Sequence, residues 1–221
     1  MSNPAGSIRV GVDLRGACQS IRDQGDRATC LACATSDAHA MFHGCAPLSA
    51  EFLFFHAIQM ATVGNLTDGI TFDEAAAALR RKGQPAEQEW PYSPKQPSPW
   101  VPPAVTKLWH GGLGLGAADA ATLIVHLLKD GQPAVLGVRM SAEFLSPAAP
   151  NFVIPAAGAG FGGHAVLVVG LGRASAGQQH LLIRNSWGNS WGDAGHAWLA
   201  VEYLNDKLIG FASVGTCPQE E

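Results

Sequence analysis

Charged residues are scarce in this chain: Asp, Glu, Lys and Arg make up 14% of its 221 residues. The formal net charge of −4 gives no electrostatic reason to expect nucleic acid or an anionic membrane as a partner. No apolar run approaches the ~20 residues that span a bilayer, and the N-terminus lacks the basic start and apolar stretch of a signal peptide. With 47% hydrophobic residues, the composition is instead typical of a globular protein with a substantial core.

Cysteine is also sparse, and its number is odd: Cys18, Cys30, Cys33, Cys45 and Cys217. A chain of this length does not need disulfides to stabilise a core, so free thiols in a reducing compartment are the simpler interpretation. One or two disulfides remain open. With no targeting signal, we expect a bacterial cytoplasmic protein, and secretion by a route without a signal peptide stays open as well.

The first half of the chain is predicted to be helical. Residues 30–43 contain neither Pro nor Gly before Gly44, and Thr29 stands at the N-cap position. A second helix is expected from Ser49, with its buried face on Phe52, Phe55 and either Ile58 or Gln59. The pattern Thr71-Phe72-Asp73-Glu74 is a capping box that leads into a third helix, closed by Gly83.

The second half is predicted to consist mostly of strands, at 134–140, 165–171, 181–184 and 197–203, with one helix at 118–129. Residues 84–103 carry seven prolines and form our preferred boundary between the halves. Residues 148–163 are expected to be a surface loop that leads to His164. Helices followed by an antiparallel sheet indicate an α+β fold. We expect one domain, 1–221, with a helical lobe at about 16–103 and a barrel-like β lobe at about 104–215 that receives residues 1–15.

Cys30 and His164 are the first candidates for catalysis. Cys30 would lie in the first turn of its helix, where unpaired N–H groups and the helix dipole favour a thiolate. A nearby imidazolium would favour the thiolate further and store a proton for a leaving group. His164 stands in a Gly-Gly-His-Ala-Val setting, a small-residue approach into an apolar strand.

A rival interpretation joins Cys30, Cys33, His39, His43 and Cys45 as a zinc or redox site. Structural zinc sites usually take ligands from two separate segments, whereas all of these would come from one helix. We therefore favour catalysis without a metal or cofactor.

Three motifs follow one another along the chain: Gln24-Gly25 before Cys30, then Gly163-His164-Ala165-Val166, then Asn185-Ser186-Trp187-Gly188 with Trp191-Gly192. Together they resemble the motifs of the papain family (C1) of cysteine peptidases. His164 and Asn185 follow Cys30 at about the 130–150 residues typical of that family. The resemblance implies a two-lobed fold in which Cys30 is the nucleophile and His164 the base and acid. It also implies that Asn185 orients the imidazole, and that Gln24 binds the oxyanion together with the Cys30 N–H.

The same resemblance implies substrate-binding residues. Gly69 would pair with the substrate backbone, and Trp187 would shield the Asn–His hydrogen bond. A specificity pocket would be lined by Ile70, Thr71, Gly137 and Ala165. Gly163 lies beside the catalytic His and joins this set. The expected partner is a peptide or protein substrate, and a separate protein inhibitor is left open.

The chain departs from the family pattern near the nucleophile. A family Cys that forms a disulfide is Arg27 here, the Gly-Ser pair before the nucleophile is Ala28-Thr29, and the Trp after it is Leu31. These changes remove no catalytic group, and the lost disulfide fits a reducing environment. Only 23 residues precede Gln24, so we expect no inhibitory pro-segment. A papain-fold amidase or acyl transferase with a dedicated substrate, or a catalytically weak peptide-binding member, stays open because fold alone does not set function.

Overall fold

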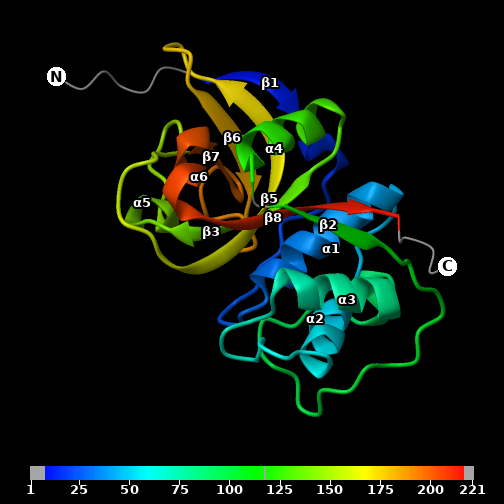
Figure 1. The fold of residues 1–221 in the computed structure, drawn as a ribbon. Coiled ribbons are helices and arrows are strands. Elements are labelled where there is room, and N and C mark those ends of the chain that lie inside the picture. Colours follow the sequence, from blue (N-terminus) through cyan, green and yellow to red (C-terminus); the bar gives the residue numbers. More distant parts are fainter. Residues whose placement is uncertain (1–7, 117, 217–221) are drawn as a thin grey trace.

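The computed structural model describes residues 8–116 and 118–216, and it divides into a helical lobe and a sheet lobe (Figure 1). Cys217 lies outside the described residues. The expected α+β class with two lobes is confirmed. None of the helices in the described ranges has the length and hydropathy of a bilayer span.

The helical lobe contains α1 (Cys30–His43), α2 (Ala50–Gln59) and α3 (Phe72–Lys82), with the short 3₁₀ turn η2 (Glu87–Glu89). Another 3₁₀ turn, η1 (Arg15–Ala17), precedes α1 and lies beside the sheet. The capping box is present as predicted, because Thr71 accepts from the Glu74 N–H and the Glu74 carboxylate accepts from the Thr71 N–H. Gly44 ends α1 in the left-handed conformation that glycine adopts without strain.

The sheet lobe contains strands joined in the order β2-β8-β3-β5-β6-β7-β4. Their bounds are β2 Gly112–Gly116, β3 Ala134–Met140, β4 Val153–Ile154, β5 Phe161–Arg173, β6 Gln179–Arg184, β7 His196–Ala200 and β8 Leu208–Gly215. All described pairs are antiparallel except β4 with β7. The described pairings give β2 and β4 one neighbour each, so the sheet is open rather than a closed barrel.

Strand β1 (Arg9–Asp13) comes from the N-terminus and pairs with the second half of β5, beyond the residues of β5 that pair with β3. The helices of this lobe are α4 (Ala120–Lys129), α5 (Ala142–Leu145), the 3₁₀ turn η3 (Val201–Tyr203) and α6 (Leu204–Lys207). The proposed lobe boundary near residue 103 stays a prediction.

Helix α1 packs directly on the sheet, because Leu31, Ala34 and Ala38 share a buried cluster with residues of β3, β5 and β8. Its other side joins α2 and α3 through Ala32, which is buried with Leu53 and Leu79. The first residue of α1 is therefore held at the junction of the two lobes.

Thr29 occupies the predicted N-cap position of α1, but its hydroxyl is bonded to Tyr92 rather than to the helix backbone. Two expectations need correction. The most buried face of α2 is formed by Leu53, Phe54 and Ala57, whereas Phe55 and Ile58 are only half-buried. The expected loop 148–163 contains β4 and the start of β5, so His164 is the fourth residue of a strand rather than its first.

Candidate active site

Cys30 is the first residue of α1, and its half-buried thiol faces strand β5. The backbone N–H of Ala165 contacts the thiol and lowers its pKa, as do the N–H groups of Leu31 and Cys30 itself. Burial acts in the opposite direction and is larger, so the net pKa of the Cys30 thiol is raised. The predicted N–H contributions are therefore present, but for the isolated thiol they are outweighed by desolvation.

His164 lies on β5 opposite Val138 of β3 and is buried. Its Nε2 is 2.7 Å from Asn185 Oδ1. Because Oδ1 also accepts the N–H of Ser186 at 2.8 Å, the amide oxygen is the atom that faces the imidazole, and Nε2 carries the proton. This tautomer leaves the Nδ1 lone pair free to accept a proton. Burial lowers the pKa of His164 to about 4, against the smaller opposing effect of Asn185.

Aromatic rings surround the His164–Asn185 pair. The Trp187 ring lies 4.5 Å from the His164 ring between centroids, with an interplanar angle of 39°, and Phe144 contacts the imidazole edge-on at 5.7 Å. These rings exclude water from the hydrogen bond. The Asn185 Nδ2 group is buried with no hydrogen-bond partner among the described residues.

Gln24 is bound to the segment that carries Asn185. The backbone N–H of Gln24 donates to Ser186 O at 2.8 Å, and Ser186 Oγ donates to Gln24 Oε1 at 2.6 Å. Gln24 Nε2 donates one hydrogen to Arg27 O at 2.8 Å. An amide nitrogen has two hydrogens, so one N–H of Gln24 is still available to a ligand.

The structure thus brings the four predicted catalytic residues together from three segments: the loop from Gln24 to Cys30, strand β5, and the turn that follows β6. The Ala165 N–H places the Cys30 thiol next to the residue that follows His164, and Asn185 binds His164. Ser186 then connects Asn185 to Gln24. Sequence patterns predicted these four residues but not Ser186, whose contact with Gln24 appears only in the fold.

The predicted substrate-binding residues differ in their placement. Ala165 and Trp187 contact the catalytic groups directly. Gly69 is buried with φ +90°, against the carbonyl of Ala28. Its N–H and C=O are both bonded to Asn65, so its carbonyl has one lone pair left for a substrate. Ile70 packs half-buried between two core clusters, and Gly163 is exposed on β5.

The rival metal site is not assembled. In the described part of the chain, no three His, Cys, Asp or Glu side chains form a group that could hold a metal ion. His39 and His43 do meet, with their Nε2 atoms 3.0 Å apart, but Cys33 is buried beneath Thr29, and burial raises the pKa of its thiol to about 12. Cys18, Cys30, Cys33 and Cys45 are all free thiols.

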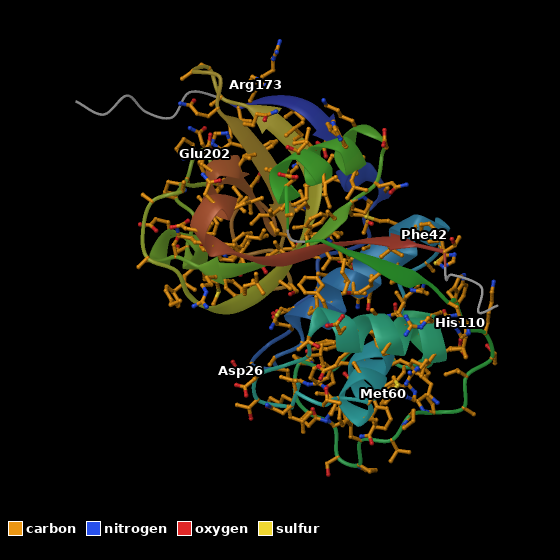
Figure 2. All side chains as sticks on the ribbon, in the orientation of Figure 1. Asp26, Phe42, Met60, His110, Arg173 and Glu202 are labelled. Atoms are coloured by element: carbon orange, nitrogen blue, oxygen red, sulfur yellow. The ribbon has the colours of Figure 1, made fainter. Side chains whose placement is uncertain are left out.

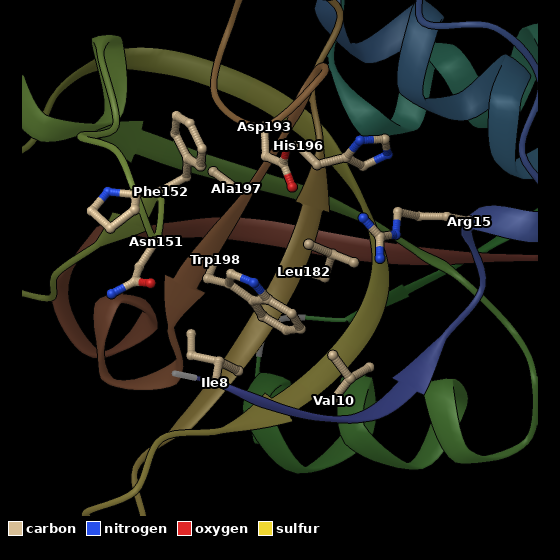
Figure 3. Close-up of a pocket in the computed structure, with 11 residues that line it drawn as sticks. Ile8, Val10, Arg15, Asn151, Phe152, Leu182, Asp193, His196, Ala197 and Trp198 are labelled. Carbon is tan, nitrogen blue, oxygen red and sulfur yellow. The ribbon is translucent and has the colours of Figure 1, made fainter. Parts of the chain in front are cut away.

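A separate pocket of about 250 Å³ lies between β1, β7 and the segment 150–152 (Figure 3). Val10, Phe152, Leu182 and Trp198 form its apolar lining, and Arg15, Asp193 and His196 lie at one end. None of Gln24, Cys30, His164 and Asn185 lines this pocket, so it is distinct from the cluster described above.

Comparison with solved structures shows the class of fold. Xylellain, a cysteine protease from Xylella fastidiosa, superposes with a TM-score of 0.73 at 23% identity, covering 99% of this chain and 94% of that one. The bromelain protease of Ananas comosus, solved with the inhibitor E64, superposes with a TM-score of 0.69 at 20% identity, covering 93% of this chain and 98% of that one. The fold is therefore papain-like.

Sequence comparison then identifies the family. The family model described as papain family cysteine protease matches residues 10–215, and the chain belongs to that family. Cathepsin J of Mus musculus is 28% identical over 99% of this chain and 69% of its own length. Other matches are local. A probable cysteine protease of Arabidopsis thaliana is 41% identical over 25% of this chain and 15% of its own length. Cathepsin K of Mus musculus is 60% identical over 25% of this chain and 16% of its own length.

Proposed function

We propose that this chain is a cysteine endopeptidase that hydrolyses peptide bonds with Cys30, His164, Asn185 and Gln24. The observation that supports it most is the continuous set of contacts from the Cys30 thiol through Ala165 and His164 to Asn185 and Gln24. Each of these residue types can perform its role without a metal or an organic cofactor.

The first step needs a proton to leave the thiol. Burial disfavours a lone thiolate at Cys30 and a lone imidazolium at His164, because each carries an uncompensated charge. Transfer of the Cys30 proton to His164 Nδ1 leaves the pair with no net charge, and the two ions then stabilise each other as one coupled unit. The Nε2–H bond to Asn185 keeps the imidazole in the tautomer that accepts this proton.

Attack of the Cys30 sulfur on a peptide carbonyl forms a C–S bond and moves the carbonyl electrons onto oxygen. The free N–H of Gln24 and the N–H of Cys30 would donate to this oxyanion. A side-chain donor of this kind contributes roughly 10²–10³ in rate. The amide cannot easily invert, since its oxygen accepts from Ser186 and its nitrogen donates to Arg27.

Collapse of the tetrahedral intermediate breaks the C–N bond, and His164 gives its proton to the departing amine. Water then attacks the thioester, with His164 accepting a proton from it, and the acid product leaves as the Cys30 thiol is restored. The proposed partners are peptide or protein substrates and a separate protein inhibitor. The four free thiols support action in a reducing compartment.

Covalent labelling with a peptidyl epoxide tests the proposal. Under reducing conditions we expect one adduct, mapped to Cys30 and lost in Cys30→Ala and His164→Ala. Gln24→Ala should lower kcat by roughly 10²-fold with KM little changed. Labelling spread over Cys18, Cys33 and Cys45, or no label on a folded protein, would contradict the assignment. Labelling of Cys30 without turnover of any peptide library would favour an acyl transferase or amidase with a dedicated substrate.

A further inference from the structure

The loop from Gln24 to Cys30 is anchored by an ion pair at the position where the related proteases were expected to carry a disulfide cysteine. Arg27 and Glu51 form two hydrogen bonds, Nη1 to Oε2 at 2.6 Å and Nη2 to Oε1 at 2.8 Å. Their side chains are 8% and 0% exposed. Asp26, the neighbour of Arg27, is exposed on the same loop (Figure 2). The side chain of Arg27, by contrast, is buried.

Glu51 and Arg27 have further partners that fix the pair in place. The Trp100 Nε1–H donates to Glu51 Oε1 at 2.6 Å, and Arg27 Nη1 also donates to Ser93 O at 2.7 Å. The guanidinium carbon lies 5.1 Å from the centre of the Tyr92 ring, within cation–π range. Helix α2 and the proline-rich segment are thereby joined to the catalytic loop without any covalent link.

Tyr92 connects this anchor to both ends of the catalytic loop. Its hydroxyl donates to the backbone carbonyl of Gln24 at 2.9 Å. A phenol has one hydrogen, so the contact of 2.6 Å with Thr29 Oγ1 must be a bond that Thr29 donates. One half-buried tyrosine hydroxyl therefore holds the residue that carries the proposed oxyanion donor and the residue that precedes the proposed nucleophile.

Arg27 acts on the same amide through its backbone. Its carbonyl accepts the first hydrogen of Gln24 Nε2, so the guanidinium end is fixed to Glu51 while the carbonyl end sets the direction of the remaining N–H. A displacement of this loop would move the oxyanion donor without removing any catalytic group.

We propose that Tyr92 is a positioning residue for the oxyanion donor Gln24, and that the Arg27–Glu51 pair, in place of a disulfide, keeps this loop in its active geometry under reducing conditions. The inference rests on the proposed function, because it assigns Gln24 an active role. A merely structural Tyr92 would contribute to stability and leave the rate of the chemical step unchanged.

The chain supplies a matched control, because its only other tyrosine, Tyr203, also donates its hydroxyl to a backbone carbonyl, Arg139 O at 2.9 Å. We expect Tyr92→Phe to lower kcat about tenfold, the equivalent of one hydrogen bond, with KM unchanged. In Tyr92→Phe, iodoacetamide should alkylate Cys30 at the unchanged rate, because this reaction forms no oxyanion. Tyr203→Phe should lose comparable stability and retain kcat.

The double variant Gln24→Ala/Tyr92→Phe should be no slower than Gln24→Ala alone, because the proposal assigns the loss of kcat in Tyr92→Phe to displacement of that amide. If the two losses multiply, or if Tyr92→Phe retains full kcat while Gln24→Ala does not, the positioning role is wrong and the proposed function stands. If Gln24→Ala itself retains full kcat, the oxyanion assignment fails first. If kcat falls as the concentration of dithiothreitol is raised, the proposal that the Arg27–Glu51 pair keeps the loop in its active geometry under reducing conditions is wrong.

Discussion

Removal of the Arg27 guanidinium should destabilise the protein far more than removal of an ordinary surface arginine. In Arg27→Met, Glu51 would lose two of the donors that it has in the structure and keep Trp100 Nε1 and Ser93 N. Breaking a buried ion pair by removing one partner costs about 3–5 kcal/mol. A domain of this size is stable by only about 5–15 kcal/mol, so this loss is a large share of the total. We expect it to lower the melting temperature by about 10 °C.

The measurement is chemical denaturation followed by tryptophan fluorescence, in a Cys30→Ala background that prevents self-digestion. Arg15→Met is the control, since the Arg15–Asp13 pair is 40% and 33% exposed and such pairs contribute about 0–1 kcal/mol. The double variant Arg27→Met/Glu51→Leu should recover part of the loss, because no buried charge is then left without a partner. A loss below about 1 kcal/mol in Arg27→Met, or a double variant whose loss is the full sum, would refute the reasoning.

Three other changes have defined outcomes. Burial lowers the pKa of His39 and His164 to about 4, below the 6.5 of an unfolded imidazole, so the unfolded chain binds protons first. The free energy of unfolding should then fall as the pH is lowered from 6.5 to about 4, by up to about 3 kcal/mol per histidine. His39→Gln should make this dependence on pH weaker. A parent protein whose free energy of unfolding does not change over this range would contradict the prediction. Gly69→Ala would place Cβ 2.6 Å from Ala28 O at φ +90°, and should lower stability and kcat/KM more than Gly177→Ala, which has φ +96° and open space. Ser186→Ala frees the Gln24 amide and should lower kcat several-fold while Cys30 alkylation is kept; equal losses in both would mean a general disturbance of the site.

Elements with strong local signals were predictable from sequence. Helix α1 has its predicted bounds because Gly44 is a stop signal that acts within one turn, and the capping box at Thr71 satisfies backbone groups only three residues apart. Strand β3 also has its predicted bounds, since it is short, apolar and bordered by Pro133 and Ser141.

Elements that depend on distant partners were not predictable in the same way. Strands β1, β2 and β8 carry weak patterns of their own, and their extended conformation is stabilised by neighbours far away in the chain. Thr29 shows the same limit for a side chain: a local rule assigns its hydroxyl to the helix, whereas Tyr92, 63 residues away, binds it.

The candidate site follows a similar division. The residues that we propose as catalytic were found from motif order. Those that hold them, such as Ser186, Tyr92 and Glu51, are ordinary polar residues until the fold brings them together. Likewise, the direction of the Cys30 pKa shift depends on burial, which no motif encodes.

The contact between Trp187 and His164 gives the protein an optical reporter of its own chemistry. An imidazolium over an indole face is attracted by the ring quadrupole and quenches the light that the indole emits. In the proposed mechanism, the emission of this one tryptophan should dim when His164 takes the proton of Cys30, and it should brighten when the proton passes to the leaving amine. Because Trp187 can be read against the other five tryptophans by substitution, the protonation state of a buried histidine can be followed in real time without any added dye.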